Sequence, residues 1–177
     1  MNINNFETKI IFLPKNIEIY KKQFNLLLKT KYGYIKFNIP KNINIYLKNS
    51  YLHIDIFNND KKSKTWEIIF RNIVNGCSRQ YLNRLVLKGV GYKAFLKSKD
   101  NIELKIGYSH PSNFLINNSP LSIDVYKNLI IQLNSPFKDQ LGSIAASLKS
   151  LKKTDVYKGK GILYKREKLN LKTGKKA

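Results

Sequence analysis

Cysteine and histidine are scarce in this sequence of 177 residues, which contains only Cys77, His53 and His110 of these types. A single cysteine forms no internal disulfide, and the three residues lack the spacing of a Cys/His zinc site. The sequence therefore predicts a fold that depends on its apolar core, without a disulfide or a structural metal. A reducing compartment is the matching expectation.

Long apolar runs are missing as well. No segment approaches the length of a transmembrane helix, so we expect no membrane span. The start MNINNFETKI has neither the layout of a secretory signal peptide nor the Arg-rich amphipathic character of an import sequence. The mature chain is therefore expected to begin near Met1.

Acidic residues are few, and no catalytic arrangement can be built from them. The 11 Asp and Glu residues show no pairing that indicates acid–base catalysis or magnesium binding. His110 precedes Pro111 without a plausible carboxylate partner, and Cys77 follows a predicted helix end, where the helix dipole disfavours a thiolate. We expect no enzymatic activity, no cofactor and no small-molecule substrate.

Positive charge is what the sequence has in excess. Its 33 Lys and Arg residues against 11 Asp and Glu give a formal net charge of +22. A charge of this size indicates a polyanionic partner. The basic residues run along the whole chain and interleave with 11 Tyr and 9 Phe, which favours nucleic acid over a membrane surface.

Alternating apolar residues predict strands, and the same order of elements occurs twice. Two runs around Lys48–Ser50 precede a helical stripe that begins at Trp66, and two runs around Lys127–Asn128 precede a second stripe that begins at Phe137. A hairpin opens each half, with its first turn at Lys31–Gly33. The prediction is an α+β fold of two tandem, duplicated domains, each a small and mostly antiparallel sheet packed against a helix.

The expected domains are residues 1–80 and residues 81–177, the second with a basic C-terminal extension. Gly76 is the expected end of the first helix. Ser135 is the expected N-cap of the second helix, with Pro136 in its first turn.

The segment from Leu85 to Pro111 predicts two strands around the turn Ser98–Asn101. The apolar residues expected on their shared face are Val90, Tyr92, Ala94, Leu96, Ile102, Leu104, Ile106 and Tyr108. The pleat then gathers Gly89, Gly91 and Gly107 on the opposite face, where a partner can approach the backbone closely.

The same segment contains a formal match to the dinucleotide-binding fingerprint G-x-G-x-x-A, from Gly89 to Ala94. That motif requires a helix after it, and a strand is predicted here instead. The stretch Lys158–Gly161 likewise lacks the GK[ST] ending of a Walker loop. A nucleotide-cofactor enzyme is therefore only a remote alternative.

The C-terminal stretch gives the strongest indication of binding. Its last 29 residues contain 11 Lys and Arg but only two acids, Asp155 and Glu167. In the Lys158–Gly161 loop, alternate glycines let the backbone and the lysines reach the same phosphate oxygens, and Tyr157 can stack on a base. Residues 169–177 are expected to form a disordered, solvated tail in the unbound protein.

Three motifs resemble a known family. They are Leu87-Lys88-Gly89-Val90-Gly91-Tyr92-Lys93-Ala94, Gly107-Tyr108-Ser109-His110-Pro111 and Tyr157-Lys158-Gly159-Lys160-Gly161-Ile162-x-Tyr164. In this order and spacing they are similar to the sixth protein of the large ribosomal subunit in its bacterial and organellar form. The resemblance is specific from Arg84 to Tyr164 and weak before Trp66.

The resemblance implies a structural protein with two related sheet-and-helix domains. The second domain would bind large-subunit ribosomal RNA near the site of translation factors, beside neighbouring ribosomal proteins. The residues expected to bind RNA are Lys88, Gly89, Gly91, Ser109, His110, Lys152, Lys153, Tyr157, Lys158, Gly159, Lys160 and Gly161. A non-ribosomal RNA-binding regulatory protein is the alternative.

Composition also bears on origin. Lys greatly outnumbers the four Arg, and Asn and Ile are abundant, as expected of an AT-rich coding sequence. Organelle genomes often have this bias. It favours a mitochondrial ribosome, with another organelle or the bacterial cytoplasm as alternatives.

Overall fold

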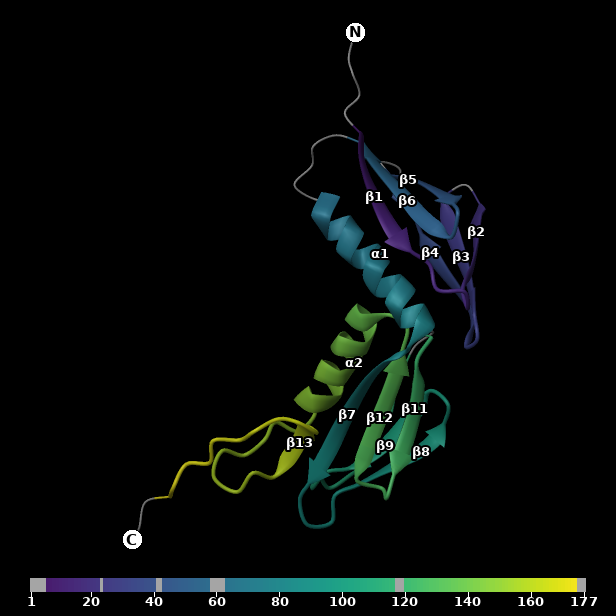
Figure 1. The fold of residues 1–177 in the computed structure, drawn as a ribbon. Coiled ribbons are helices and arrows are strands. Elements are labelled where there is room, and N and C mark those ends of the chain that lie inside the picture. The colour runs from purple at the N-terminus through teal and green to yellow at the C-terminus, as the bar shows by residue number, and fades with distance from the viewer. Residues whose placement is uncertain (1–5, 23, 41–42, 58–62, 117–119, 175–177) are drawn as a thin grey trace. The chain divides into compact units, whose positions relative to one another are not determined.

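The computed structural model describes residues 6–22, 24–40, 43–57, 63–116 and 120–174. The described residues form thirteen strands and two helices, which divide between Gln80 and Tyr81 into two compact units (Figure 1). We call them the N-terminal unit and the C-terminal unit. Antiparallel sheets accompanied by one helix in each unit confirm the predicted α+β class.

The N-terminal unit consists of two three-stranded sheets and a helix. Its elements are β1 (Phe6–Phe12), β2 (Glu18–Lys22), β3 (Asn25–Thr30), β4 (Gly33–Asn38), β5 (Ile43–Lys48), β6 (Tyr51–Phe57) and α1 (Ser63–Ser78). The antiparallel sheets have the orders β1-β6-β5 and β2-β3-β4. Phe70 of α1 is fully buried and lies edge-on to Phe37 of β4, with 5.4 Å between ring centroids. The helix therefore packs against the β2-β3-β4 sheet.

The C-terminal unit repeats this order and adds one strand. Its elements are β7 (Tyr81–Lys88), β8 (Lys93–Ser98), β9 (Asn101–Lys105), β10 (Ser112–Leu115), β11 (Ser122–Tyr126), β12 (Ile130–Ser135), α2 (Lys138–Ser150) and β13 (Gly161–Tyr164). They form a four-stranded sheet of order β11-β12-β7-β13 and a three-stranded sheet of order β10-β9-β8.

Corresponding strands of the two units pair alike. In each unit the first strand pairs with the sixth and the sixth with the fifth, which gives β1-β6-β5 and β7-β12-β11. The turns before β6 and β12 also share a left-handed backbone, with φ of 46° and 63° at Asn49 and Ser50 and of 52° and 56° at Lys127 and Asn128. The predicted duplication is confirmed by this topology.

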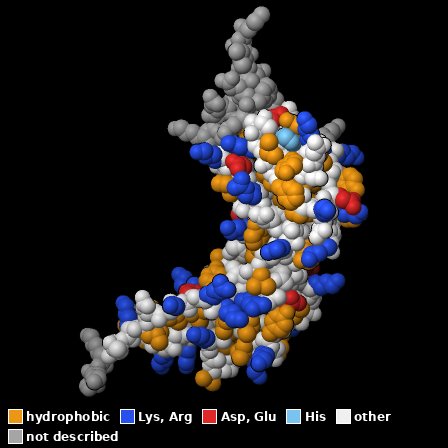
Figure 2. All heavy atoms as spheres, viewed as in Figure 1, with side chains coloured by type: hydrophobic (Ala, Val, Ile, Leu, Met, Phe, Trp, Pro, Cys, Tyr) orange, Lys and Arg blue, Asp and Glu red, His pale blue; other side chains and the backbone are white. Residues whose placement is uncertain are grey.

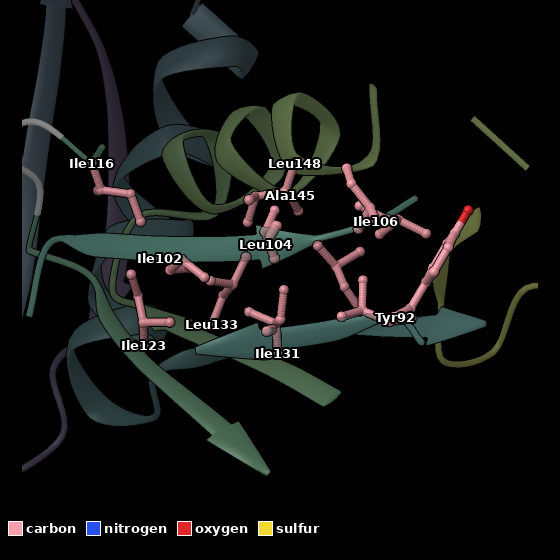
Figure 3. Close-up of a cluster of buried hydrophobic side chains, with 14 of the residues drawn as sticks. Tyr92, Ile102, Leu104, Ile106, Ile116, Ile123, Ile131, Leu133, Ala145 and Leu148 are labelled. Atoms are coloured by element: carbon pink, nitrogen blue, oxygen red, sulfur yellow. The ribbon is translucent and has the colours of Figure 1, made fainter. Parts of the chain in front are cut away.

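The core of the C-terminal unit lies between its sheets and α2 (Figure 3). Leu104 of β9 is directed toward Ala145 and Leu148 of α2, and Ile131 and Leu133 of β12 lie on its other side. All five side chains are fully buried. Burial of each large aliphatic side chain contributes about 1.5–3 kcal/mol, so this cluster supplies a large part of the stability of the C-terminal unit.

The first helix is longer than the sequence predicted. α1 continues past Gly76 to Ser78, and both Gly76 and Cys77 are buried in its last turn. Burial raises the pKa of the Cys77 thiol to about 12. The thiol therefore stays protonated at neutral pH, in agreement with its exclusion as a nucleophile.

The second helix begins later than predicted, and Ser135 is not its N-cap. α2 starts after Phe137, which occupies the N-cap position without a side-chain capping bond. Ser135 is instead the buried last residue of β12, opposite Tyr81 of β7. Its hydroxyl accepts a 3.2 Å hydrogen bond from the Phe137 amide, so pairing in the sheet takes precedence over capping.

The predicted strand pair from Leu85 to Pro111 is only partly correct. Its turn and the pairing of β8 with β9 are as expected, but Leu85 belongs to β7 in the other sheet. The chain turns after β7, with φ of 75° at Gly91, and leaves Val90 89% exposed. Leu96 and Tyr108 are exposed too, so the buried face is shorter than the sequence pattern.

Candidate nucleic-acid interface

Three segments of the C-terminal unit meet at one end of its core, which we call the basic end. β13 pairs with β7 so that Gly161 lies opposite Lys88. The Tyr108 hydroxyl donates a 2.9 Å hydrogen bond to the Leu151 carbonyl, and the Lys152 ammonium lies 4.3 Å from the centre of the Tyr108 ring. These contacts join the end of β7 and its following loop, the loop after β9 and the segment after α2, which contain all twelve predicted site residues.

The segment between α2 and β13 folds into a closed turn around Asp155. Its carboxylate accepts hydrogen bonds from the backbone amides of Tyr157 at 3.0 Å and Lys158 at 3.1 Å. The Asp155 amide donates to the Lys160 carbonyl at 2.9 Å, and the Gly159 amide donates to the Asp155 carbonyl at 3.0 Å. The Tyr157 amide is the main cause that lowers the pKa of the Asp155 carboxyl, followed by the Lys158 amide and the lysine charges. The chain's own hydrogen bonds therefore hold this turn.

The glycines of this turn face inward and its lysines face outward. Gly159 and Gly161 are buried and have φ of +65° and +145°. A Cβ at Gly161 would lie 2.7 Å from the Thr154 Cα. Lys158 and Lys160 are exposed. The glycines thus shape the loop instead of opening its backbone to a ligand, and the ammonium groups are left to solvent.

In its described part the predicted solvated tail is exposed from Asn170 to Gly174, but it also contacts the turn before it. The Leu171 side chain lies against Gly159, and the Lys172 amide donates a 2.9 Å hydrogen bond to the Val156 carbonyl. The extension therefore packs on the turn that it follows in sequence. Residues 175–177 lie outside the described part of the chain.

The predicted bare glycine face is filled by a side chain of the same unit. A Cβ at Gly89 would lie 2.9 Å from the Tyr92 ring, and one at Gly107 would lie 3.3 Å from it. Tyr92 stands at the end of the core cluster in Figure 3 and is 9% exposed. Only Gly91 of the three predicted glycines has open space beside it. The first two glycines accommodate Tyr92, so no external partner is required there.

Most predicted site residues are open to solvent. The exposed ones are Lys88, Gly91, Ser109, His110, Lys153, Tyr157, Lys158 and Lys160, whereas Gly89 and Lys152 are half-buried. Figure 2 shows many Lys and Arg side chains, with few acidic ones among them, on the visible face of the C-terminal unit. The basic end therefore presents cations from two segments that are distant in sequence, the end of β7 and the segment after α2, while the loop after β9 adds Ser109 and His110.

The two acids of the extension are engaged in internal contacts. Glu167 accepts hydrogen bonds from the Lys149 ammonium at 2.6 and 2.7 Å and from the Tyr164 amide at 3.1 Å. The Lys149 bond is the main cause that lowers the pKa of the Glu167 carboxyl. Because Asp155 likewise binds backbone amides, both acids stabilise the path of the extension.

Replacement of Glu167 by glutamine should destabilise the C-terminal unit by about 1 kcal/mol at neutral pH, a value reduced for partial solvent exposure. The folded-state pKa of Glu167 lies below its ordinary value of 4.5, so its contribution is complete above that pH and is lost as pH falls through the folded pKa. Thermal unfolding of both proteins at neutral and acidic pH should show the difference disappear in acid. A difference that persists in acid would contradict this assignment.

A second group of cations was missed by the sequence prediction. It surrounds a depression lined by Leu82, Asn83, Arg84, Tyr164, Lys165 and Arg166. The Lys165 amide, directly after β13, donates a 2.9 Å hydrogen bond to the Arg84 carbonyl of β7, which brings these two basic residues together. The Arg84 side chain donates a 2.8 Å hydrogen bond to the Gln132 side chain. The sequence offered one hint, since Arg84 and Arg166 are two of only four arginines.

Other kinds of site receive no support within the described ranges. No three His, Cys, Asp or Glu side chains gather there in a way that could hold a metal ion. Neither described helix is long and apolar enough to cross a membrane.

No family model matches the sequence. The chain is 35% identical over 171 residues to the large ribosomal subunit protein uL6c of Phaeodactylum tricornutum, covering 94% of this chain and 95% of the relative. It is 34% identical over 183 residues to uL6m of Reclinomonas americana, covering 96% and 97%. It is also 33% identical over 173 residues to uL6 of Metamycoplasma arthritidis, covering 96% of each chain.

These matches extend over nearly the full length of the chain and include the N-terminal unit, where the sequence motifs were few. They confirm the resemblance stated from the three C-terminal motifs. All three relatives are named as proteins of the large ribosomal subunit. The chain therefore belongs to the uL6 family and is a structural constituent of the ribosome, not an enzyme.

Proposed function

We propose that the C-terminal unit binds large-subunit ribosomal RNA through its basic end. The observation that carries the proposal is the pair of exposed lysines, Lys158 and Lys160, on a turn that Asp155 holds in shape. A cation on a preformed turn loses less conformational freedom on binding than one on a loose tail, so it contributes more to affinity.

The predicted residues divide into contacts and supports. The proposed contacts are Lys88, Gly91, Ser109, His110, Lys152, Lys153, Tyr157, Lys158 and Lys160, and the supports are Gly89, Gly159 and Gly161. The lysines neutralise phosphates, and the 57% exposed Tyr157 stacks on an unpaired base. Because A-form RNA offers proteins mainly phosphates and a shallow minor groove, recognition depends on shape more than on base sequence.

Binding of the full chain to isolated large-subunit RNA should depend strongly on salt. If Lys88, Lys153, Lys158 and Lys160 each neutralise one phosphate, the logarithm of the affinity should fall with the logarithm of the salt concentration at a slope of about −3 to −4. A filter-binding titration measures the slope. A slope near zero would contradict the phosphate contacts.

Sedimentation of a lysate separates this function from that of a free RNA-binding regulator. The chain should travel with large subunits in moderate salt. Failure to do so while it still binds isolated RNA would favour the regulator.

The docked chain is also proposed to support the region where translation factors bind, in contact with neighbouring ribosomal proteins. This part of the proposal is supported by the resemblance of the three motifs to the family. Subunits that lack the chain should be slower in factor-dependent steps and unchanged in peptide-bond formation. Equal slowing of both reactions would contradict a role confined to the factor site.

The ribosome in question is proposed to be mitochondrial. The support is the Lys-, Asn- and Ile-rich composition, together with a uL6m relative of 34% identity. The relatives named uL6c and uL6 are as similar to this chain as uL6m is, so sequence identity does not distinguish the three origins. An experiment must distinguish them. RNA that co-purifies with the tagged chain should be mitochondrial, and plastid or bacterial ribosomal RNA would overturn this assignment.

A further inference from the structure

The extension after β13 turns back and closes on the turn that precedes β13. Its first fixed point is Glu167, whose carboxylate accepts the hydrogen bonds described above and whose amide donates one of 3.0 Å to the Tyr164 carbonyl. Its last fixed point is the Lys172 amide, which donates to the Val156 carbonyl at 2.9 Å. In Figure 1 the extension runs beside the loop between α2 and β13. We call residues 167–172 the strap.

Two leucines of the strap lie directly over a glycine of the turn. A Cβ built on Gly159 would lie 3.4 Å from Cδ2 of Leu171 and 3.5 Å from Cδ1 of Leu169, which is contact distance for apolar groups. The three heavy atoms nearest to such a Cβ all belong to these two leucines. Gly159 is buried and has a φ of +65°, so the strap covers the residue at which the turn reverses direction.

The strap leaves the proposed RNA contacts open. Lys158 and Lys160, on either side of the buried glycine, are exposed, and Tyr157 is 57% exposed. A segment that blocked the RNA site would bury these side chains. The strap instead covers the side of the turn from which the lysines point away, so it supports the turn and does not compete with RNA.

We infer that Leu169 and Leu171 are positioning residues for RNA binding, because they hold the turn that carries Lys158 and Lys160. The hydrogen bonds of Asp155 fix this turn only from within, between residues 155 and 160. Short surface loops held by a few exposed hydrogen bonds open at low cost in free energy. Apolar contact with a segment that is anchored on β13 and α2 restricts this opening before RNA arrives.

Preorganisation of this kind raises affinity, because conformational freedom that is already lost in the free protein is not lost again on binding. The inference rests on the proposed function of the turn and gives the strap a role in it. The role does not depend on charge, since both leucines are neutral. It can therefore be separated by experiment from phosphate neutralisation by the lysines of the extension.

Hydrogen exchange in the free full chain tests the support directly. Leu169→Ser with Leu171→Ser removes the apolar contact and leaves the net charge of +22 unchanged. The backbone amides of Lys158 and Gly159 should then exchange about tenfold faster, as measured by NMR. The amides of β7 and β13 should keep their protection, because the core of the C-terminal unit is not altered.

Two matched variants show whether the apolar contact is responsible. Asn170→Ser with Thr173→Ser changes two exposed residues of the same extension and should exchange like the wild type. Leu169→Met with Leu171→Met keeps apolar side chains of similar volume and should retain most of the protection. Faster exchange in the Asn170 and Thr173 variant, or as fast in the methionine variant as in the serine variant, would contradict the assignment.

Affinity for isolated large-subunit RNA separates positioning from a purely structural role. The serine variant should bind about tenfold more weakly, with the salt slope of the wild type, because no phosphate contact is removed. In a chain that already carries Lys158→Ala with Lys160→Ala, the same serine substitutions should lower affinity less than about twofold. The turn then has no cations left to position, whereas general destabilisation would weaken binding in either background.

The outcomes separate this inference from the proposed function. Unchanged exchange in the serine variant, a changed salt slope, or a full tenfold loss in the chain without the two lysines would overturn the positioning role alone. A gain in RNA affinity would also overturn it and would show that the strap covers the RNA site. If the wild type does not bind the RNA, the proposed function fails and the positioning role fails with it.

Discussion

Gly161→Ala should destabilise the C-terminal unit by about 3–5 kcal/mol, the sum of backbone strain and overpacking at a site that cannot relax. The added Cβ would lie 2.7 Å from the Thr154 Cα and 2.9 Å from the Lys153 carbonyl oxygen, both of them backbone atoms. The φ of +145° is also one that alanine rarely adopts. The expected loss is a large part of a domain's usual stability of about 5–15 kcal/mol.

Gly142→Ala is the matched control for this substitution. Gly142 lies inside α2 with nothing within 4 Å of an added Cβ, so alanine there should stabilise the helix by about 0.5–1 kcal/mol. Hydrogen exchange followed by mass spectrometry reports both effects, because Gly161→Ala should remove protection from β13 and from the paired part of β7. Unchanged protection in these strands would show that the turn shifts without cost.

Lys158→Glu with Lys160→Glu should reduce affinity for large-subunit RNA by about two to three orders of magnitude, since two phosphate contacts are replaced by repulsion. Both lysine side chains are exposed, and the hydrogen bonds that hold the turn use their backbone groups. The fold should therefore survive the change. The affinity is measured with isolated RNA at fixed salt, and circular dichroism checks the fold.

The control has the same change of net charge at a different place. Lys22→Glu with Lys36→Glu alters two exposed lysines on the outward face of the β2-β3-β4 sheet and should weaken binding less than tenfold through long-range repulsion alone. Equal losses for both pairs would mean that only total charge matters. Unfolding of the Lys158 and Lys160 variant would make those side chains structural.

Strands with one buried face were predictable, because their apolar side chains alternate. In β6 the inward Leu52 and Ile54 are fully buried, and β12 shows the same arrangement with Ile131 and Leu133. Both helices were recognised from their apolar stripes for the same reason. Such patterns depend on residues close in sequence, so they can be read without the tertiary structure.

Two of the strands that the sequence did not predict, β1 and β13, lack this pattern. In β1 the alternation is broken by Lys9, whose ammonium lies 4.0 Å from the Glu67 carboxylate of α1. β13 is only four residues long and follows the alternating Lys158-Gly159-Lys160. Its buried Ile162 and Leu163 pair with a strand far away in the sequence, so no local signal indicated it.

By itself the sequence determined the α+β class, the repeated order of elements, the large excess of positive charge and the motifs of the uL6 family. All of these follow from composition, local periodicity and short spacings. Only the tertiary structure decided that three distant motifs share one end of a core, that Gly89 accommodates Tyr92, and that Leu169 and Leu171 lie over Gly159. Those features depend on strand register and side-chain packing between segments far apart in the chain, which local patterns do not encode.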